Sequence, residues 1–113
     1  MFDKNVPVGM RRFLSEHDVR TFEQMGWHPQ LENGALLTAA EVAGFEVMIT
    51  SDQNIRYQQN LKGRKLALIV LGSNIWPIVR DHQGPITANA AAAKPGSYCF
   101  IEMPLPPKRR QNR

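Results

Sequence analysis

The sequence has one cysteine, no long apolar run and no excess charge over most of its length. Cys99 alone cannot form an internal disulfide, and it leaves no cysteine cluster for zinc. No apolar stretch is long enough to cross a bilayer, and the start, Met-Phe-Asp-Lys-Asn, has no apolar signal region. We therefore expect one cytoplasmic domain that does not bind membranes, since 113 residues suit a single domain.

The net charge of +4 resides in the C-terminal tail. Residues 104–113 hold four of the 14 basic residues and none of the 10 acidic ones, so residues 1–103 are neutral. Pro104, Pro106 and Pro107 predict an extended, disordered tail that follows a domain spanning 1–103. Two roles for this tail stay open, a solubilising terminus or a short basic arm that contacts RNA or DNA.

Segments with strand and helix patterns alternate along the chain. Asn33 is a good helix N-cap, and Gly44 is expected to end the helix that follows it. The unbroken apolar run 66–71 is typical of a strand covered on both faces. The alternation predicts an α/β layered fold with a mostly parallel sheet. Strands are expected at Phe2, 18–22, 45–50, 66–71 and 97–103, and helices at 7–14, 33–43, 74–82 and 86–93.

Polar residues stand where three of the predicted strands end. The first strand is followed by Asp3 and Asn5, the third by Asp52 and Asn54, and the fourth by a segment that contains Asn74. Parallel strands end at one edge of their sheet, and ligands of open α/β sheets bind there. Residues two apart in an extended segment face the same side, so each Asp-x-Asn is expected to aim its carboxylate and amide at a common point.

Two carboxylates at this edge would repel each other by about 4 kcal/mol at a separation of about 4 Å. A divalent cation removes that repulsion, and oxygen ligands of this kind suit Mg²⁺ or Mn²⁺. The chemistry that follows is metal-assisted hydrolysis of a phosphodiester. A second interpretation stays open, because Asp and Asn after a strand are also turn formers and helix caps. Asp3 would then cap the helix that starts near Pro7, and Asp52 would cap the segment that follows Asp52.

Four short stretches carry a resemblance that covers nearly all of residues 1–103. They are Phe-Asp-Lys-Asn-Val-Pro at the start, Asn33-Gly34 with Leu37 and Ala40, Ile-Thr-Ser-Asp-Gln-Asn at 49–54, and Pro-Gly-Ser-Tyr at 95–98. In order and spacing they resemble a group of small PIN-like proteins, formally of unknown function. The resemblance implies a three-layer α/β sandwich with a mostly parallel sheet of about five strands. It also implies the activity of VapC-type toxins, an Mg²⁺- or Mn²⁺-dependent ribonuclease checked by a small antitoxin protein.

The resemblance assigns metal-binding and catalytic roles to Asp3 and Asp52. In many relatives a third Asp opens the central helix, and here that position is Asn33. Lys4 stands where the common start has Glu, so both changes remove negative charge from the cleft. Two functions follow from these departures: a ribonuclease with a poorer metal site, or a catalytically degenerate interaction module on the same scaffold.

The remaining candidate residues concern RNA and protein partners. In a nuclease, Arg56 would contact a phosphate and Tyr57 would stack on a base, while Asn5 and Asn74 would also contact the substrate. Asn33 and Asn54 would orient water or ligand near the acids. The equal alternative for the segment after Asp52 is a solvated helix. RNA, a small antitoxin and a second copy of the chain are the expected partners, the last through exposed apolar positions.

Overall fold

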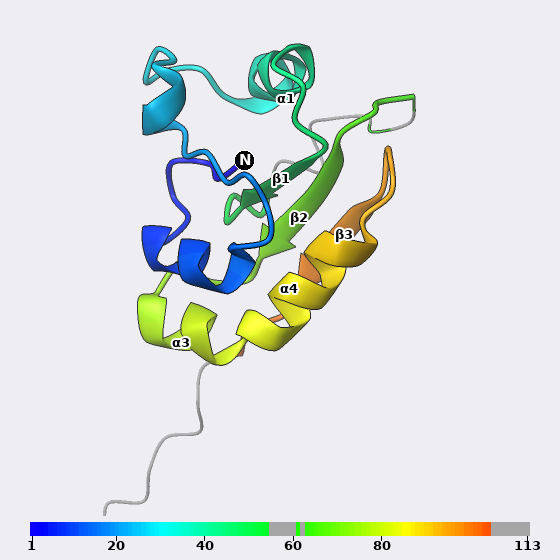
Figure 1. Cartoon of the computed structure of the whole chain (residues 1–113). Helices are drawn as coiled ribbons and strands as arrows, with labels where there is room; N and C mark the ends of the chain where they lie inside the picture. Colours follow the sequence, from blue (N-terminus) through cyan, green and yellow to red (C-terminus); the bar gives the residue numbers. More distant parts are fainter. Residues whose placement is uncertain (55–60, 62, 105–113) are drawn as a thin grey trace, which may run out of the picture.

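The computed structural model describes residues 1–54, 61 and 63–104, without the side chain of Asn33. Helices pack around a sheet of parallel strands, which confirms the predicted α/β class (Figure 1). The elements are the 3-10 helices η1 (Val8–Leu14) and η2 (Glu23–Met25), the helices α1 (Asn33–Val42), α3 (Trp76–Asp81) and α4 (Gln83–Ala92), and the strands β1 (Val47–Thr50), β2 (Ala67–Leu71) and β3 (Tyr98–Ile101). No helix among the described residues is both long and apolar enough to span a bilayer.

The sheet has three strands in the order β1-β2-β3, and all of them are parallel. In the register, Ile49 stands beside Ile69, and Ile69 beside Cys99. The predicted strands at Phe2 and 18–22 do not form. These two segments contribute only isolated parallel bridges, from Phe2 to Thr21 and from Phe2 to Ile49. The described part of the chain therefore has three strands, where about five were expected.

Local hydrogen bonds explain why these two strands stop at single bridges. Directly after Phe2 the chain turns, and Val6 N donates to Asp3 O at 3.1 Å. Thr21 N donates to the side chain of Gln24, and Gln24 N donates back to Thr21 Oγ1, which starts the turn into η2. In both segments the backbone leaves the extended conformation after one paired residue.

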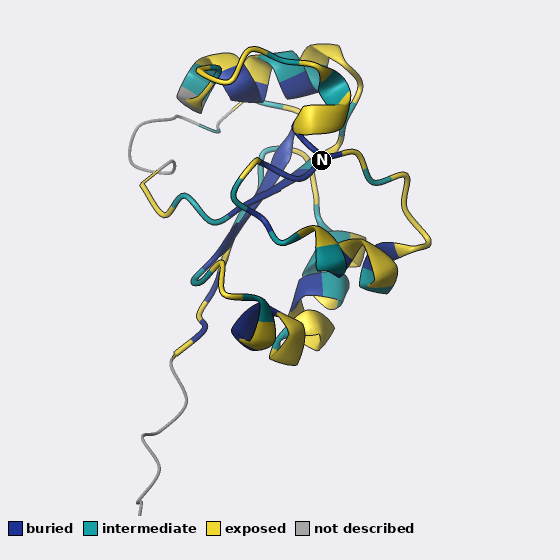
Figure 2. Ribbon diagram, turned by 90° about the vertical axis from the view of Figure 1, so that its left-hand side faces the viewer, coloured by how far each residue is buried: buried dark blue, intermediate teal, exposed yellow. Residues whose placement is uncertain are grey.

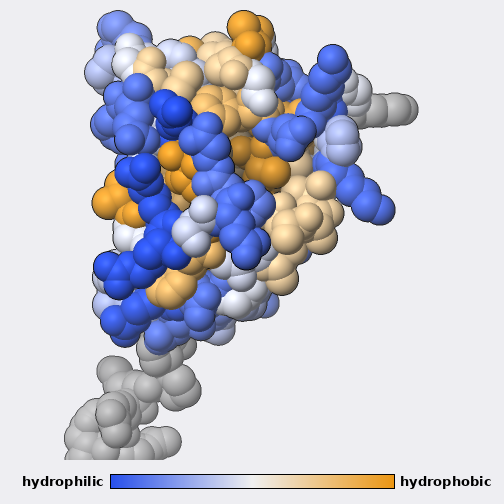
Figure 3. Space-filling view, viewed as in Figure 1, coloured by the Kyte–Doolittle hydropathy of each residue, from blue (hydrophilic) through white to orange (hydrophobic). Residues whose placement is uncertain are grey.

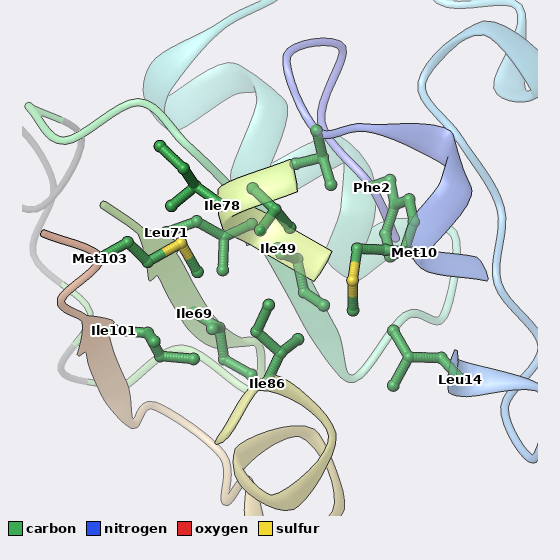
Figure 4. Packing of buried hydrophobic residues seen from close by; sticks show 12 residues of the cluster. Phe2, Met10, Leu14, Ile49, Ile69, Leu71, Ile78, Ile86, Ile101 and Met103 are labelled. Atoms are coloured by element: carbon green, nitrogen blue, oxygen red, sulfur yellow. The ribbon is translucent and has the colours of Figure 1, made fainter. Parts of the chain in front are cut away.

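Apolar residues are buried on both faces of the sheet. All five residues of β2 are buried, as the unbroken apolar run predicts. One face carries Ile49, Ile69 and Leu71, which pack with residues of η1, α3 and α4 (Figure 4). The other face carries Met48, Leu68 and Val70, which pack with α1. Figure 2 shows the buried strands between helices whose outer sides are exposed. Each large apolar side chain buried in this way contributes about 1.5–3 kcal/mol.

Helix α1 begins at Asn33 itself, so the prediction of Asn33 as N-cap is wrong. Glu32 occupies the N-cap position with an extended backbone, and its side chain makes no capping hydrogen bond. The predicted end of the helix is confirmed. Gly44 has φ of +93°, a left-handed conformation that glycine adopts readily. This conformation lets Phe45 N donate to Ala40 O at 3.0 Å and leads the chain into β1.

The parallel strands bring distant loops to one edge of the sheet. Strands β1, β2 and β3 end at Thr50, Leu71 and Ile101, so the segments that follow them start at the same edge. The parallel bridge between Phe2 and Ile49 sends Asp3 and its neighbours in the same direction. We call this edge, where residues 3–6, 51–54, 72–75 and 102–104 meet, the carboxyl edge.

Candidate functional site

The hydroxyl of Thr50 connects the two predicted acidic residues. Thr50 Oγ1 donates to Asp3 Oδ2 at 2.7 Å and accepts a hydrogen bond from Asp52 N at 3.0 Å. Thr50 is fully buried, Asp3 is buried and Asp52 is half-buried. The carboxylate of Asp3 and the backbone of Asp52, 49 positions later in the chain, therefore share one hydroxyl at the carboxyl edge. We refer to Asp3, Thr50 and Asp52 as the acid pair and its bridge.

A second pair of hydrogen bonds holds the same two segments together. Ser51 N donates to Asn5 Oδ1 at 3.0 Å, and Ser51 Oγ donates to Asn5 O at 3.3 Å. The amide of Asn5 therefore fixes the chain directly after β1. The predicted substrate-contacting residue Asn5 thus supports the architecture of the carboxyl edge.

The two Asp-x-Asn segments are turns and not the extended segments that the prediction assumed. The carboxylate of Asp3 and the amide of Asn5 nonetheless reach neighbouring residues, Thr50 and Ser51. Asp52 Oδ1 accepts from Asn54 N at 3.1 Å, and Asp3 Oδ1 accepts from Lys4 N at 2.7 Å. Both carboxylates accept from a backbone N–H one or two residues later in the chain, which stabilises a bend in the segment. The turn-forming role that the sequence left open is present at both positions.

Lys4 lies in the turn after Asp3, but its side chain contacts residues outside that turn. Its ammonium donates to Pro29 O and lies 5.1 Å from the centre of the Phe22 ring, a cation–π distance. This contact attaches the turn after Asp3 to the segment that leads into α1. Trp27 packs edge-on against the same Phe22 ring, with the ring centres 5.7 Å apart.

A cleft of about 440 Å³ lies beside the acid pair at the carboxyl edge. Gln53 Nε2 donates to Gly72 O at 3.1 Å and so links the loop after β1 to the loop after β2. Ser73 Oγ accepts from Ile75 N at 3.1 Å, which bends the second loop into α3. The cleft is lined by Asn5, Ser51, Gln53, Gly72, Ser73, Asn74, Ile75 and Met103.

Only some of the predicted site residues lie at the cleft. Asn5 and Asn74 line the cleft, and Asn54 lies in the adjoining turn. Asn33 is the first residue of α1, and its side chain is not described. Arg56 and Tyr57 lie outside the described residues, so their predicted contacts with RNA stay predictions.

Several residues of the carboxyl edge escaped the sequence analysis. Thr50 was visible only as the last residue of a strand, and its hydroxyl bridge joins positions 47 residues apart in the chain. Gln53, Ser73 and Ile75 were not assigned a role, although all three follow strand ends. Their position after a buried strand is the signal that could have identified them.

Asp3 and Asp52 are the two carboxylates of the predicted site, and the described residues hold nowhere a group of three or more histidine, cysteine, aspartate and glutamate side chains arranged for a metal. Asp3 uses both carboxylate oxygens as acceptors, whereas Asp52 Oδ1 accepts the bond from Asn54 N. Mg²⁺ retains several waters and is commonly held by one or two carboxylates together with substrate phosphates. The residues present therefore fit a largely hydrated ion and do not form an all-protein cage.

A second cavity, of about 480 Å³, lies near the start of β1. Phe45 and Val47 contribute to its apolar part, and Asp18 and Arg20, which form an ion pair at 3.1 Å, contribute to its polar part. Burial lowers the pKa of the Met1 amino group, which donates to Val47 O, to about 6, and Asp18 opposes this shift. On the face seen in Figure 3, hydrophobic side chains gather in the middle and hydrophilic ones surround them.

Comparisons with protein-family models, with curated proteins and with solved structures found no match to this chain. The PIN-like resemblance therefore rests on the four stretches quoted from the sequence.

Proposed function

We propose that the chain is a nuclease that cleaves RNA with the help of Mg²⁺ or Mn²⁺. The observation that carries this proposal is the acid pair and its bridge, where Thr50 Oγ1 donates to Asp3 Oδ2 and accepts from Asp52 N. The acid pair stands at the carboxyl edge of a parallel sheet, which is where α/β proteins bind their ligands. A cleft of about 440 Å³ opens next to it.

Asp3 and Asp52 would hold the metal ion in this proposal. A bound divalent ion supplies charge stabilisation at a phosphodiester and a more acidic water. The bridge from Thr50 keeps Asp3 oriented, because a buried carboxylate that receives two hydrogen bonds has little freedom to rotate. Asp52 is half-buried and is the more accessible of the two acids. In the proposed site, Asp52 is therefore the acid that solvent and substrate reach more easily.

The finer parts of the proposal rest on the sequence resemblance. We propose a PIN-like fold in which the bridged segments at Phe2 and Thr21 correspond to two further strands of a three-layer sandwich. On the same ground, we propose a cytoplasmic toxin whose partner is a small antitoxin protein. The PIN-like resemblance supports both statements, and the geometry of the acid pair is compatible with them.

The test is cleavage of a single-stranded RNA with Mn²⁺ or Mg²⁺ present. We expect cleavage by the wild-type chain, inhibition by EDTA, and a loss of more than about 100-fold in the variant Asp52→Asn. Asp81→Asn is the matched control, because Asp81 is an exposed acid on α3 whose ion pair with Arg80 measures 3.8 Å. Equal cleavage by wild type and Asp52→Asn, or cleavage that persists in EDTA, would contradict the proposal.

The second candidate is an interaction module that has lost catalysis. The observation that favours it is that both oxygens of Asp3 accept hydrogen bonds within the chain, from Lys4 N and from Thr50 Oγ1. Such a module would dimerise or bind a partner through the basic tail, 104–113, and the large exposed hydrophobic residues. The described hydrophobics of this kind lie on different elements: Val8, Val42, Ile75 and Phe100. Deleting 104–113 should then weaken the complex, and an undiminished complex would reject that role for the tail.

A further inference from the structure

The cleft beside the acid pair has a neutral lining. The residues described around it contribute amides, hydroxyls and apolar groups, and none of them carries a charge. Two of the lining residues lie close to the acids in the chain, because Asn5 follows Asp3 by two positions and Ser51 immediately precedes Asp52. A molecule that spans the cleft and the acid pair would therefore meet a neutral part and an acidic part in succession.

The polar groups of the lining include both donors and acceptors. Gln53 uses its Nε2 in the hydrogen bond to Gly72 O, so its Oε1 can accept from a ligand. The hydroxyl oxygen of Ser73 accepts from Ile75 N, so its hydrogen can be donated. Asn74 is exposed and has an amide that both donates and accepts. The cleft therefore suits a planar ligand whose edge alternates donors and acceptors.

Apolar contact area accompanies these polar groups. Ile75 is 51% exposed and is one of four exposed large hydrophobic side chains among the described residues. Met103, which is buried, also lines the cleft. An exposed isoleucine beside amide groups offers a surface for the flat side of a ring.

We propose that this cleft binds an unpaired base of a single-stranded RNA. Asparagine and glutamine amides match the donor–acceptor pairs on base edges, and the volume of about 440 Å³ accommodates one base with its ribose. The lining has no positively charged side chain that would attract a phosphate group. This inference rests on the proposed function, because it takes the phosphodiester next to the bound base as the bond presented to Asp3 and Asp52. It predicts that cleavage depends on the base beside the cut.

The experiment measures binding by fluorescence anisotropy in EDTA, where no cleavage occurs. The probes are short RNA strands that each contain one kind of base, and an abasic strand of the same length and charge. We expect at least one base to bind about fivefold or more tightly than the abasic strand. The double variant Gln53→Ala/Asn74→Ala should lose this preference. Gln83→Ala, an exposed glutamine at the start of α4, is the matched control and should retain it.

The outcomes separate this inference from the proposed function. If the abasic strand binds as tightly as every base-containing strand, the cleft does not take a base, whether or not RNA is cleaved with Mn²⁺. If the base preference is present but survives in the double variant, the base binds elsewhere and the inference is overturned. If the preference depends on Gln53 and Asn74 while no cleavage occurs with metal, the base site stands and the nuclease proposal fails. Circular dichroism of each variant verifies that it is folded.

Discussion

The two edges of the sheet use acidic residues in different ways. At the amino edge, Glu41 from α1 accepts hydrogen bonds from Lys65 N at 2.6 Å, Leu66 N at 3.1 Å and Arg64 Nη1 at 2.8 Å. These bonds tie α1 to the start of β2. At the carboxyl edge, the carboxylate of Asp52 accepts one hydrogen bond from the described residues, from Asn54 N, and a cleft opens beside it.

The pKa of Glu41 reflects these three hydrogen bonds. Burial alone would raise the pKa of Glu41, but the N–H groups of Leu66 and Lys65 and the guanidinium of Arg64 hold it below the ordinary value. An acid that receives three donors within the chain is a structural connector. Among the described residues, the carboxylate of Asp52 therefore receives one hydrogen bond where that of Glu41 receives three.

The largest effect is expected from breaking the amino edge. Glu41→Ala leaves two backbone N–H groups and a partly buried guanidinium without their acceptor, since Arg64 and Glu41 are 20% and 21% exposed. We expect a loss of about 2–4 kcal/mol in the free energy of unfolding, measured by urea denaturation. Glu46→Ala, an exposed acid near the start of β1, is the control and should change stability by less than about 0.5 kcal/mol. A similar loss in both variants would show that Glu41 has no special role.

The next effect concerns the bridge at the carboxyl edge. Thr50→Val keeps the shape of the side chain but removes the hydroxyl that Asp3 and Asp52 share. We expect a loss of about 1–3 kcal/mol in unfolding free energy, because Asp3 is buried and would lose a donor. Thr50→Ser, which retains the hydroxyl, should lose less. If Val is tolerated better than Ser, the shared hydroxyl does not hold this edge together.

Close packing at the same edge gives a third prediction. A Cβ added at Gly72 would lie 2.9 Å from Met103 N and 3.1 Å from Ile101 O, so Gly72→Ala must displace the end of β3. We expect a loss of about 1–3 kcal/mol in unfolding free energy. Gly84→Ala in α4 meets nothing within 4 Å and should be neutral or stabilising, by up to about 1 kcal/mol. Equal effects at the two glycines would contradict the close approach at Gly72.

The smallest effect is a pH dependence of the amino edge. Because the pKa of Glu41 is lowered in the folded state, its contribution to stability is present above the ordinary carboxyl range. This contribution is lost as the pH falls through the lowered pKa of Glu41. The stability difference between wild type and Glu41→Gln, measured by urea denaturation, should therefore shrink as the pH is lowered from 7 to 3. A difference that is independent of pH would reject the charged form of Glu41 as the connector.

Sequence patterns predicted the parts of the fold that depend on local chemistry. The unbroken run in β2, the apolar spacing of α1 and the left-handed Gly44 each follow from neighbouring residues. The first two strands could not be predicted correctly, because the turn at Asp3 competes with strand pairing. Similarly, the bridge through Thr50 joins positions 47 residues apart, and no local pattern encodes it. What the sequence did predict is that Asp3 and Asp52 lie at one edge.

The central claim is that this edge holds a divalent cation through Asp3 and Asp52, and calorimetric titration with Mn²⁺ tests it most directly. We predict that the wild-type chain binds one ion and that Asp52→Asn binds it more than about 100-fold more weakly. Asp81→Asn, on the surface of α3, should bind like wild type. No heat of binding in the wild type, or the same affinity in Asp52→Asn, would contradict the claim.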